Sequence, residues 1–167
     1  MHSHRRRHNI RGHIYGIIDY QLEARRLRSE AEEGSPKIRD EMLRWAIRFH
    51  GHLGPFLILG LRAGLRAVEL FGHNPFKLKA IVTLKRAIPY TCFLDGIQFS
   101  TGCTLGKGNI EVLEGHGIVV RFIHEGRELT LRVRDEILEK ALNAEDMEGE
   151  ALKLLRLPLD ELFVERH

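Results

Sequence analysis

The segment from residue 91 to residue 109 concentrates side chains that could do chemistry. Cys92, Asp95 and Gln98 recur at intervals of three, and residues three or four apart lie on one face of a helix. The chain then places several glycines around a single cation, Lys107. Glycines at this density are typical of a backbone that adopts positive φ or approaches a ligand closely. A thiol, a carboxylate and an amide beside such a turn predict a binding or catalytic site.

Further groups that could bind a metal lie upstream, where His50 and His52 flank Gly51. Gly54 and Pro55 follow, so both histidines fall in a junction between two predicted helices. Imidazoles two apart on a turn can point to one centre and bind a metal ion. An imidazole beside a thiol is also the basic unit of cysteine nucleophiles. A transition-metal site and a Cys-dependent transferase or hydrolase therefore both stay open.

The glycine turn does not match a nucleotide-binding P-loop. That motif needs Ser or Thr after its lysine and a longer interval between its glycines, whereas here Gly108 follows Lys107. Each polar group of the turn also has a plainer interpretation. Cys103 could be a small buried residue, Lys107 a solvated turn residue, and Gln98 a partner for backbone groups of the turn.

Two helices are predicted to position the histidines. The first begins at Ser35–Pro36, ends near residue 49, and has one continuous apolar face formed by Ile38, Met42, Trp45 and Phe49. The second, over residues 55–72, is predicted to bury Leu57, Leu61, Leu65 and Val68 and to expose Arg62, Arg66 and Glu69. Gly60 and Gly64 each cost a helix roughly 1 kcal/mol relative to alanine. A helix that contains both is expected to lie close to another backbone, at the centre of the fold.

The rest of the chain predicts strands followed by helices. Strands are expected at 78–88 and, as a three-stranded meander, at 110–113, 117–124 and 128–133. Helices are expected at 135–142 and 147–155, with Leu162 and Phe163 docked on the body. This order predicts an α+β fold, with helices packed on a mainly antiparallel sheet. We expect one domain over residues 14–167, with core motifs at 40–135 and a helical tail at 135–167.

Composition limits the function classes. The net charge of +3 is accounted for by arginines in residues 1–13, a basic His/Arg-rich arm that is expected to be mobile. No aromatic residue interleaves with these arginines, so nucleic-acid binding is not favoured. No apolar run is long enough to span a membrane, and two cysteines in a chain of this size indicate a reducing compartment, the cytoplasm. Scarce Asn and Gln beside abundant Arg and Glu are typical of a thermophilic source.

Four blocks of the sequence resemble the FmdE family of formylmethanofuran dehydrogenase proteins. They are HGHLGP from His50, GLRA from Gly60, CFLDGIQ from Cys92 and TGCTLGKGN from Thr101. Their order and spacing agree with the family over about residues 40–135, and the last block is the most specific. The tail LLRLPLDELFVER is also similar to the helical ending of that family's core domain.

The resemblance implies an α+β core that pairs into a dimer, with a His/Cys cleft that binds a transition metal, most simply zinc. It implies His50, His52 and Cys92 as metal ligands, and an association with a larger molybdenum or tungsten oxidoreductase. A non-catalytic dimeric adaptor is the competing interpretation. Two features depart from the family: Gly54 stands where a cysteine is expected, and the chain contains no CxxC pair for a C-terminal zinc ribbon.

The remaining predicted site residues have supporting roles. Cys92, Asp95 and Lys107 are the candidates for catalysis, while Asp95 and Gln98 could also support the ligands or contact substrate. The residues expected to form a lip for a small anionic ligand are Gln98, Thr101, Gly102, Cys103, Gly106, Lys107 and Asn109.

Overall fold

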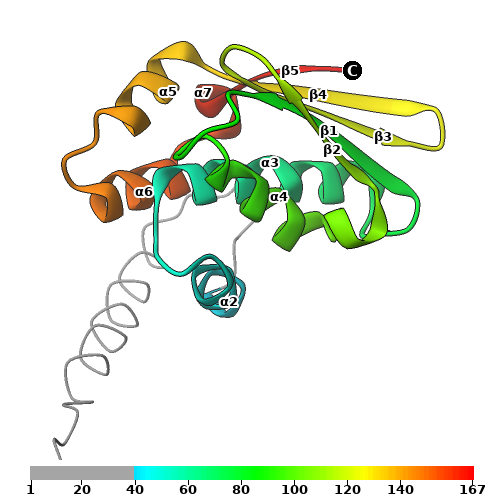
Figure 1. Cartoon of the computed structure of the whole chain (residues 1–167), viewed down its shortest axis with the longest axis horizontal. Coiled ribbons are helices and arrows are strands. Elements are labelled where there is room, and N and C mark those ends of the chain that lie inside the picture. Colours follow the sequence, from blue (N-terminus) through cyan, green and yellow to red (C-terminus); the bar gives the residue numbers. More distant parts are fainter. Residues whose placement is uncertain (1–39) are drawn as a thin grey trace, which may run out of the picture. The chain divides into compact units, whose positions relative to one another are not determined.

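The computed structural model of the chain describes residues 40–167, which belong to one compact unit, Gly34–His167. The predicted basic arm and helix start at Ser35–Pro36 lie outside the described residues. In the described part, helices cover one face of a five-stranded sheet (Figure 1). The predicted α+β class is therefore confirmed. No helix in residues 40–167 is long and apolar enough to cross a membrane.

The helices and strands follow the predicted order closely. The helices are α2 (Asp40–His50), α3 (Pro55–Phe71), α4 (Cys92–Thr101), a 3-10 turn η1 (Leu105–Lys107), α5 (Asp135–Leu142), α6 (Met147–Arg156) and α7 (Leu159–Leu162). The strands are β1 (Leu78–Leu84), β2 (Ile110–Glu114), β3 (Ile118–His124), β4 (Arg127–Val133) and β5 (Phe163–Arg166).

The sheet has the order β2-β1-β3-β4-β5, so the predicted meander is wrong in one respect. β1 lies between β2 and β3: it pairs parallel with β2, starting at Ala80 opposite Ile110, and antiparallel with β3. Parallel neighbours need a crossover connection, and α4 supplies it between β1 and β2. Turn signals alone could not show that an earlier strand lies between two consecutive ones. The short final strand β5, which pairs with β4, was not predicted.

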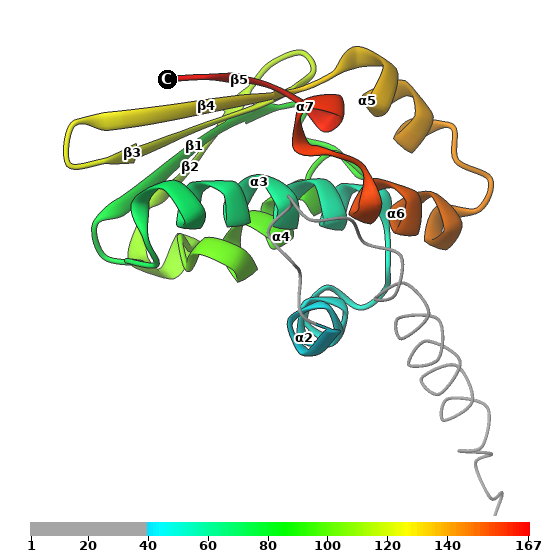
Figure 2. The same cartoon turned by 180° about the vertical axis from the view of Figure 1, so that it is seen from behind.

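The helix α3 lies at the centre of the fold, as predicted, and is buried on almost every side. Figures 1 and 2 show it beside α4, beneath the sheet. A Cβ atom on Gly60 would collide with the Phe93 carbonyl oxygen, and one on Gly96 with the backbone of α3. Glycines on both helices therefore allow the two backbones to approach, which explains why α3 accepts residues of low helix propensity.

The predicted exposure of Arg62 is wrong, because its side chain is 1% exposed. Its guanidinium donates hydrogen bonds to the carbonyl oxygens of Leu154 (3.2 Å), Leu155 (2.7 Å) and Leu157 (2.9 Å) at the end of α6. Carbonyls at a helix C-terminus lack partners within the helix and attract a cation. Arg62 thus joins the central helix to the C-terminal segment, a long-range contact that helical periodicity cannot reveal.

The apolar face predicted for α2 is not buried at Trp45 and Phe49, which are 52% and 57% exposed. The residues that α2 buries are Leu43 and Ala46. Ile38 lies outside the described residues. α2 packs mainly on α4 among the described elements, so one narrow face is covered and the aromatic face is left open.

Candidate functional site

The junction between α2 and α3 positions the two histidines. His50 is the last residue of α2, and Gly51 turns the chain at φ +103°, a value that favours glycine. The Gly51 amide still donates to the Ile47 carbonyl oxygen at 2.7 Å, so the break falls directly after His50. Pro55 then starts α3. His52 is left on a short link held between two helix ends, with its ring centroid 4.6 Å from that of His50.

His50 is oriented by Asp95 of α4. Its Nδ1 lies 2.7 Å from Asp95 Oδ2, and the imidazole side chain is only 6% exposed. An ionised carboxylate can only accept, so Nδ1 is the donor to it, and in the neutral tautomer of the ring Nε2 keeps a free lone pair. That Nε2 atom is buried and finds no hydrogen-bond partner in the described part of the chain. A buried acceptor without a partner is costly, and a bound ligand would satisfy it.

The structure brings His50, His52 and Cys92 to the wall of one cavity of about 90 Å³. The three side chains therefore share a cleft, although forty residues separate the histidines from the thiol, and the role of these residues as ligands stays a prediction. The other lining residues are apolar or lack a polar side chain: Gly54, Pro55, Phe56, Leu57, Pro89, Ala141, Leu142, Ala144 and Met147. A space of this size holds roughly three water volumes of ~30 Å³, enough for an ion with small ligands.

Cys92 begins α4, one turn before Asp95. Partial burial and the nearby negative charge of Asp95 raise the pKa of its thiol, with burial the larger cause. The protonated thiol is a poor nucleophile, because the thiolate is the reactive form. A bound cation would reverse this balance, since metal binding deprotonates a coordinating thiol.

Gly54 lies against the second histidine. A Cβ atom at this position would stand 3.0 Å from His52 Nε2. A cysteine at residue 54, as the family resemblance implies, would therefore place its sulfur beside the imidazole. Glycine leaves this part of the cavity wall without a sulfur ligand.

The glycine turn lies at the other end of α4 from the cavity. α4 has ten residues, about 15 Å at 1.5 Å each, and Gly102 ends it in the left-handed region at φ +71°. Gln98 Oε1 accepts a hydrogen bond from the Leu105 amide at 3.3 Å, as the plainer interpretation predicts. The other polar side chains also act within or beside the turn: Thr101 accepts from the Cys103 amide, Asn109 from the Thr104 amide, and Lys107 Nζ donates to Thr104 Oγ1.

Cys103 is fully buried, and its Sγ lies 3.3 Å from the Leu78 carbonyl oxygen. Burial raises the pKa of this thiol. No residue of the turn lines the cavity that holds the histidines. The predicted contacts of Gly102, Gly106 and Lys107 with a small anion stay a prediction, separate from the histidine cavity.

The donor atoms suit a transition metal in kind, because imidazole nitrogen and thiolate sulfur bind zinc and related ions. The His50–Asp95 pair and the unpartnered Nε2 atom fit a ligand that is held by its neighbour. Even so, no group of three or more His, Cys, Asp or Glu side chains in residues 40–167 is spaced to hold a metal ion. A metal would have to draw His52 and Cys92 towards His50.

Sequence reasoning missed one wall of the cavity. Ala141 and Leu142 at the end of α5, Ala144 in the connector and Met147 at the start of α6 all line it. These residues lie far from His50 in sequence, and no spacing connects them to it. The one local signal is Asp146, whose side chain accepts from the Gly149 amide and caps α6 directly before Met147.

The fold and cavity define an α+β protein whose central helix pair supports a cavity with imidazole and thiol groups. Residues 49–164 match the family described as FmdE, Molybdenum formylmethanofuran dehydrogenase operon. The match covers most of the chain, so this chain belongs to the FmdE family.

A curated protein of Archaeoglobus fulgidus is also similar. It is described as a probable S-adenosyl-L-methionine-binding protein and is 35% identical over 86 residues. The aligned region is 50% of this chain and 24% of that protein, so the chain spans about a quarter of its relative.

Proposed function

We propose that this FmdE-family protein binds a transition-metal ion through His50, His52 and Cys92. The observation that carries the proposal is the His50 imidazole. Asp95 fixes it through Nδ1, its Nε2 is buried and unpartnered among the described residues, and it lines the same cavity as Cys92. Zinc is the simplest candidate, because it accepts nitrogen and sulfur ligands in flexible proportion. A bound ion would supply Lewis-acid polarisation to a small ligand.

Each residue has a defined part in this proposal. Asp95 holds the His50 tautomer and raises the basicity of Nε2. His52 is exposed and sits on the glycine-flanked link, so its ring can turn towards the cavity with little disturbance to either helix. Most residues that line the cavity are apolar, and an environment of lower polarity strengthens electrostatic interactions. The raised pKa of Cys92 in the absence of a cation favours this function over an unassisted cysteine nucleophile.

Metal competition tests the proposal. The full-length protein is titrated with Zn²⁺ against a chromogenic chelator, beside His50→Ala, Cys92→Ala and the control His116→Ala, which changes an exposed histidine outside the cavity. We expect about one ion per chain, a loss of at least about tenfold in affinity for the first two variants, and no change for the control. Wild-type affinity in both cavity variants would contradict the proposal. Elemental analysis of protein from native cells identifies the ion.

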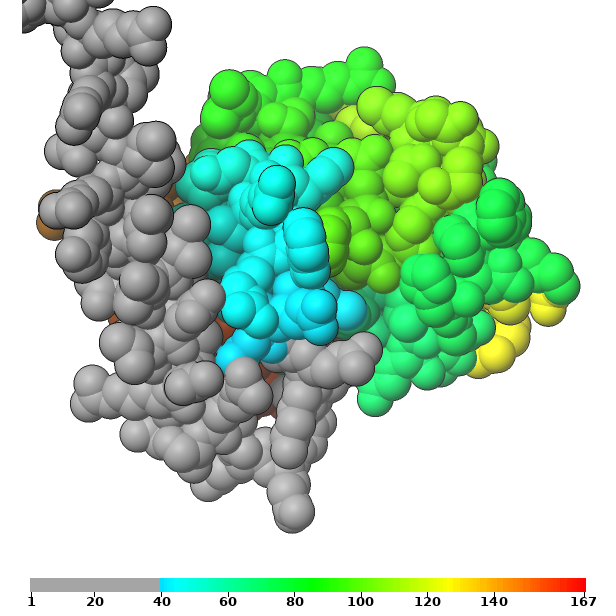
Figure 3. All heavy atoms as spheres, turned by 90° about the horizontal axis from the view of Figure 1, so that it is seen from below, coloured from blue at the N-terminus to red at the C-terminus, as the bar shows by residue number. Residues whose placement is uncertain are grey.

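We also propose that the protein assembles through an aromatic patch, defined as Trp45, Arg48, Phe49 and Phe99. The Phe49 and Phe99 ring centroids are 6.1 Å apart, and the Arg48 guanidinium lies 5.5 Å from the centre of the Trp45 ring. On the face in Figure 3, α2 (cyan) borders the green segment that includes α4. Exposed Trp, Phe and Arg are the residues that binding interfaces favour.

The first occupant that we propose for the aromatic patch is a second copy of the chain, with the interface beside residues 91–109. A larger oxidoreductase is the second, since the family description refers to a formylmethanofuran dehydrogenase operon. Tagged wild-type protein and Phe49→Asp would be purified from native cells and their co-purifying proteins compared. An oxidoreductase component retained by wild type and lost by Phe49→Asp supports the adaptor role. A tagged wild type that retains no such component would contradict it.

A further inference from the structure

A second sulfur-containing residue besides Cys92 lines the cavity. Met147 lines the same cavity as His50, His52 and Cys92, and it comes from the C-terminal segment instead of the helix pair. Its side chain is 53% exposed, so the core does not need it for packing. A large apolar side chain that is half exposed on a cavity wall is free to contact what enters the cavity.

The position of Met147 is fixed at both ends of its helix. At the start of α6, Asp146 Oδ1 accepts a hydrogen bond from the Gly149 amide at 2.9 Å. At the end of α6, Arg62 of the central helix binds the last carbonyl groups. The backbone at residue 147 is thereby held against the cavity, while the methionine side chain keeps three rotatable bonds with which to reach an ion.

The combination of donors has a definite chemical preference. Two imidazoles, a thiolate and a thioether form a softer ligand set than zinc normally uses, because zinc takes cysteine, histidine and carboxylate ligands. Thiolate and thioether sulfur together favour Cu(I), and a His₂Cys set with a weak methionine ligand is typical of copper sites. Asp95 bonds to His50 through Oδ2 and is not among the residues that line the cavity, so it does not add a hard oxygen ligand to the set.

We propose that Met147 is a thioether ligand and that the cavity prefers a soft cation, Cu(I), over Zn²⁺. The proposal rests on the metal-binding function proposed above and specifies the class of metal. Met147 would add a fourth donor to His and Cys side chains that, in the described residues, are not spaced to hold a metal ion, so binding would require these side chains to move together.

Paired metal titrations test this proposal. Cu(I) is supplied anaerobically as its bicinchoninate complex and Zn²⁺ with a chromogenic chelator, for wild type, Met147→Leu, Cys92→Ala and Met42→Leu. Leucine keeps the volume and helix propensity of methionine and removes only the sulfur. Met42→Leu is the matched control, since Met42 lies on α2 and does not line the cavity. X-ray absorption on the copper-loaded protein counts the sulfur ligands.

We expect Met147→Leu to weaken Cu(I) binding by about tenfold or more and to leave Zn²⁺ affinity within about twofold, with one sulfur scatterer lost. Unchanged Cu(I) affinity in Met147→Leu would overturn the thioether ligand, and so would an equal loss for both metals. Cys92→Ala separates this outcome from failure of the proposed function. If Cys92→Ala binds both metals as wild type does, the metal site itself is misplaced; if it loses them while Met147→Leu does not, only the soft-metal inference fails.

Discussion

At the scale of single residues, the candidate site depends on the contact between His50 and Asp95. The 2.7 Å hydrogen bond joins the end of α2 to the first turns of α4 and fixes which imidazole nitrogen is available. A mobile histidine would lose conformational entropy when it bound a ligand, whereas this imidazole ring is already oriented and desolvated. The carboxylate therefore acts through the imidazole, as a positioning residue.

Asp95→Asn is expected to weaken Zn²⁺ binding by about tenfold, and Asp95→Ala by up to about a hundredfold, because partners of metal-ligating histidines typically contribute this much. Chelator competition measures the affinities, and ¹⁵N NMR of the imidazole reports the His50 tautomer. Glu111→Gln, on an exposed strand position, is the control. If Asp95→Ala kept both the wild-type affinity and the tautomer, Asp95 would have no positioning role.

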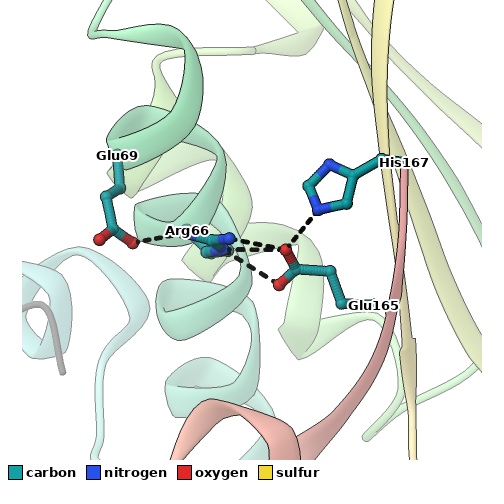
Figure 4. Close-up of polar contacts among 4 residues, drawn as sticks. All are labelled: Arg66, Glu69, Glu165 and His167. Atoms are coloured by element: carbon teal, nitrogen blue, oxygen red, sulfur yellow. Dashed lines mark hydrogen bonds and ion pairs between the residues drawn. The ribbon is translucent and has the colours of Figure 1, made fainter. Parts of the chain in front are cut away.

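Glu165 provides a pH-dependent link between β5 and α3 (Figure 4). Arg66 donates to both of its carboxylate oxygens, at 3.0 Å from Nε and 2.7 Å from Nη2. The hydrogen bond from Arg66 is the main cause that lowers the pKa of Glu165, and partial burial opposes it. Because the folded-state pKa lies below the unfolded value, this pair stabilises the fold above about pH 4.3 and loses its effect as pH falls through the folded-state pKa.

Glu165→Gln should therefore lower the free energy of unfolding by about 1–2 kcal/mol at pH 7. This range is reduced for solvent screening, because the Arg66 and Glu165 side chains are each about a quarter exposed. The difference from wild type should shrink as pH falls below about 4. Urea unfolding at several pH values measures both. The control is Glu125→Gln, whose pair with Lys77 is more than half exposed and should contribute no measurable stability. A Glu165→Gln effect that stayed constant with pH would exclude the ionic contribution.

At the scale of elements, α3 and α4 position the site because glycines let them touch. The start of α4 presents Cys92 and Asp95, and the start of α3 presents Gly54 and Pro55, so the helix spacing sets the width of the cavity. His50 is joined to α3 by the short link at residues 51–54, so a wider separation of α3 from α4 would move Asp95 away from His50. Packing of the helix pair is thus coupled to the geometry of the site.

Gly60→Ala should destabilise the protein by about 3 kcal/mol, the upper part of the range for overpacking, because the new Cβ meets backbone that cannot rotate away. Gly106→Ala is the control: its nearest neighbour to a new Cβ is Thr104 Oγ1 at 3.9 Å. Thermal and urea unfolding compare the two. Equal stability of both variants would mean that the helix pair relaxes freely, and the close-approach argument would fail.

The sequence predicted those elements whose signals are local. Gly72 ends α3 where the predicted helix ends, and glycine-containing turns located β3 and β4 within a residue or so. Contacts between distant segments could not be predicted. The burial of Arg62, the insertion of β1 between β2 and β3, and the approach of Met147 to the histidines depend on which elements meet. The GLRA block did contain Arg62, but the block alone does not say that the arginine is buried.

At the scale of the whole molecule, the exposed aromatic side of α2 is relevant to association with other chains. Trp45 and Phe49 form part of a patch that adjoins α4, the segment that also carries Cys92 and Asp95. An apolar face of this kind is costly in water and is a common mark of a protein interface. In a twofold dimer the same patch would lie on both sides of the interface. Pairing there would place the partner chain against α2 and α4, the two helices that carry His50 and Asp95.

We expect light scattering at low micromolar concentration and moderate salt to give twice the chain mass of 19.3 kDa. Phe49→Asp should shift the protein to monomer, since a desolvated carboxylate without a partner at an interface core opposes association. The control is Phe76→Asp, a phenylalanine that is 85% exposed and lies outside the aromatic patch. A clean monomer mass for the wild type would remove the dimer. A dimer that persists in Phe49→Asp would place the interface on another surface, and the metal affinity of that variant would then show whether association and the cavity are coupled at all.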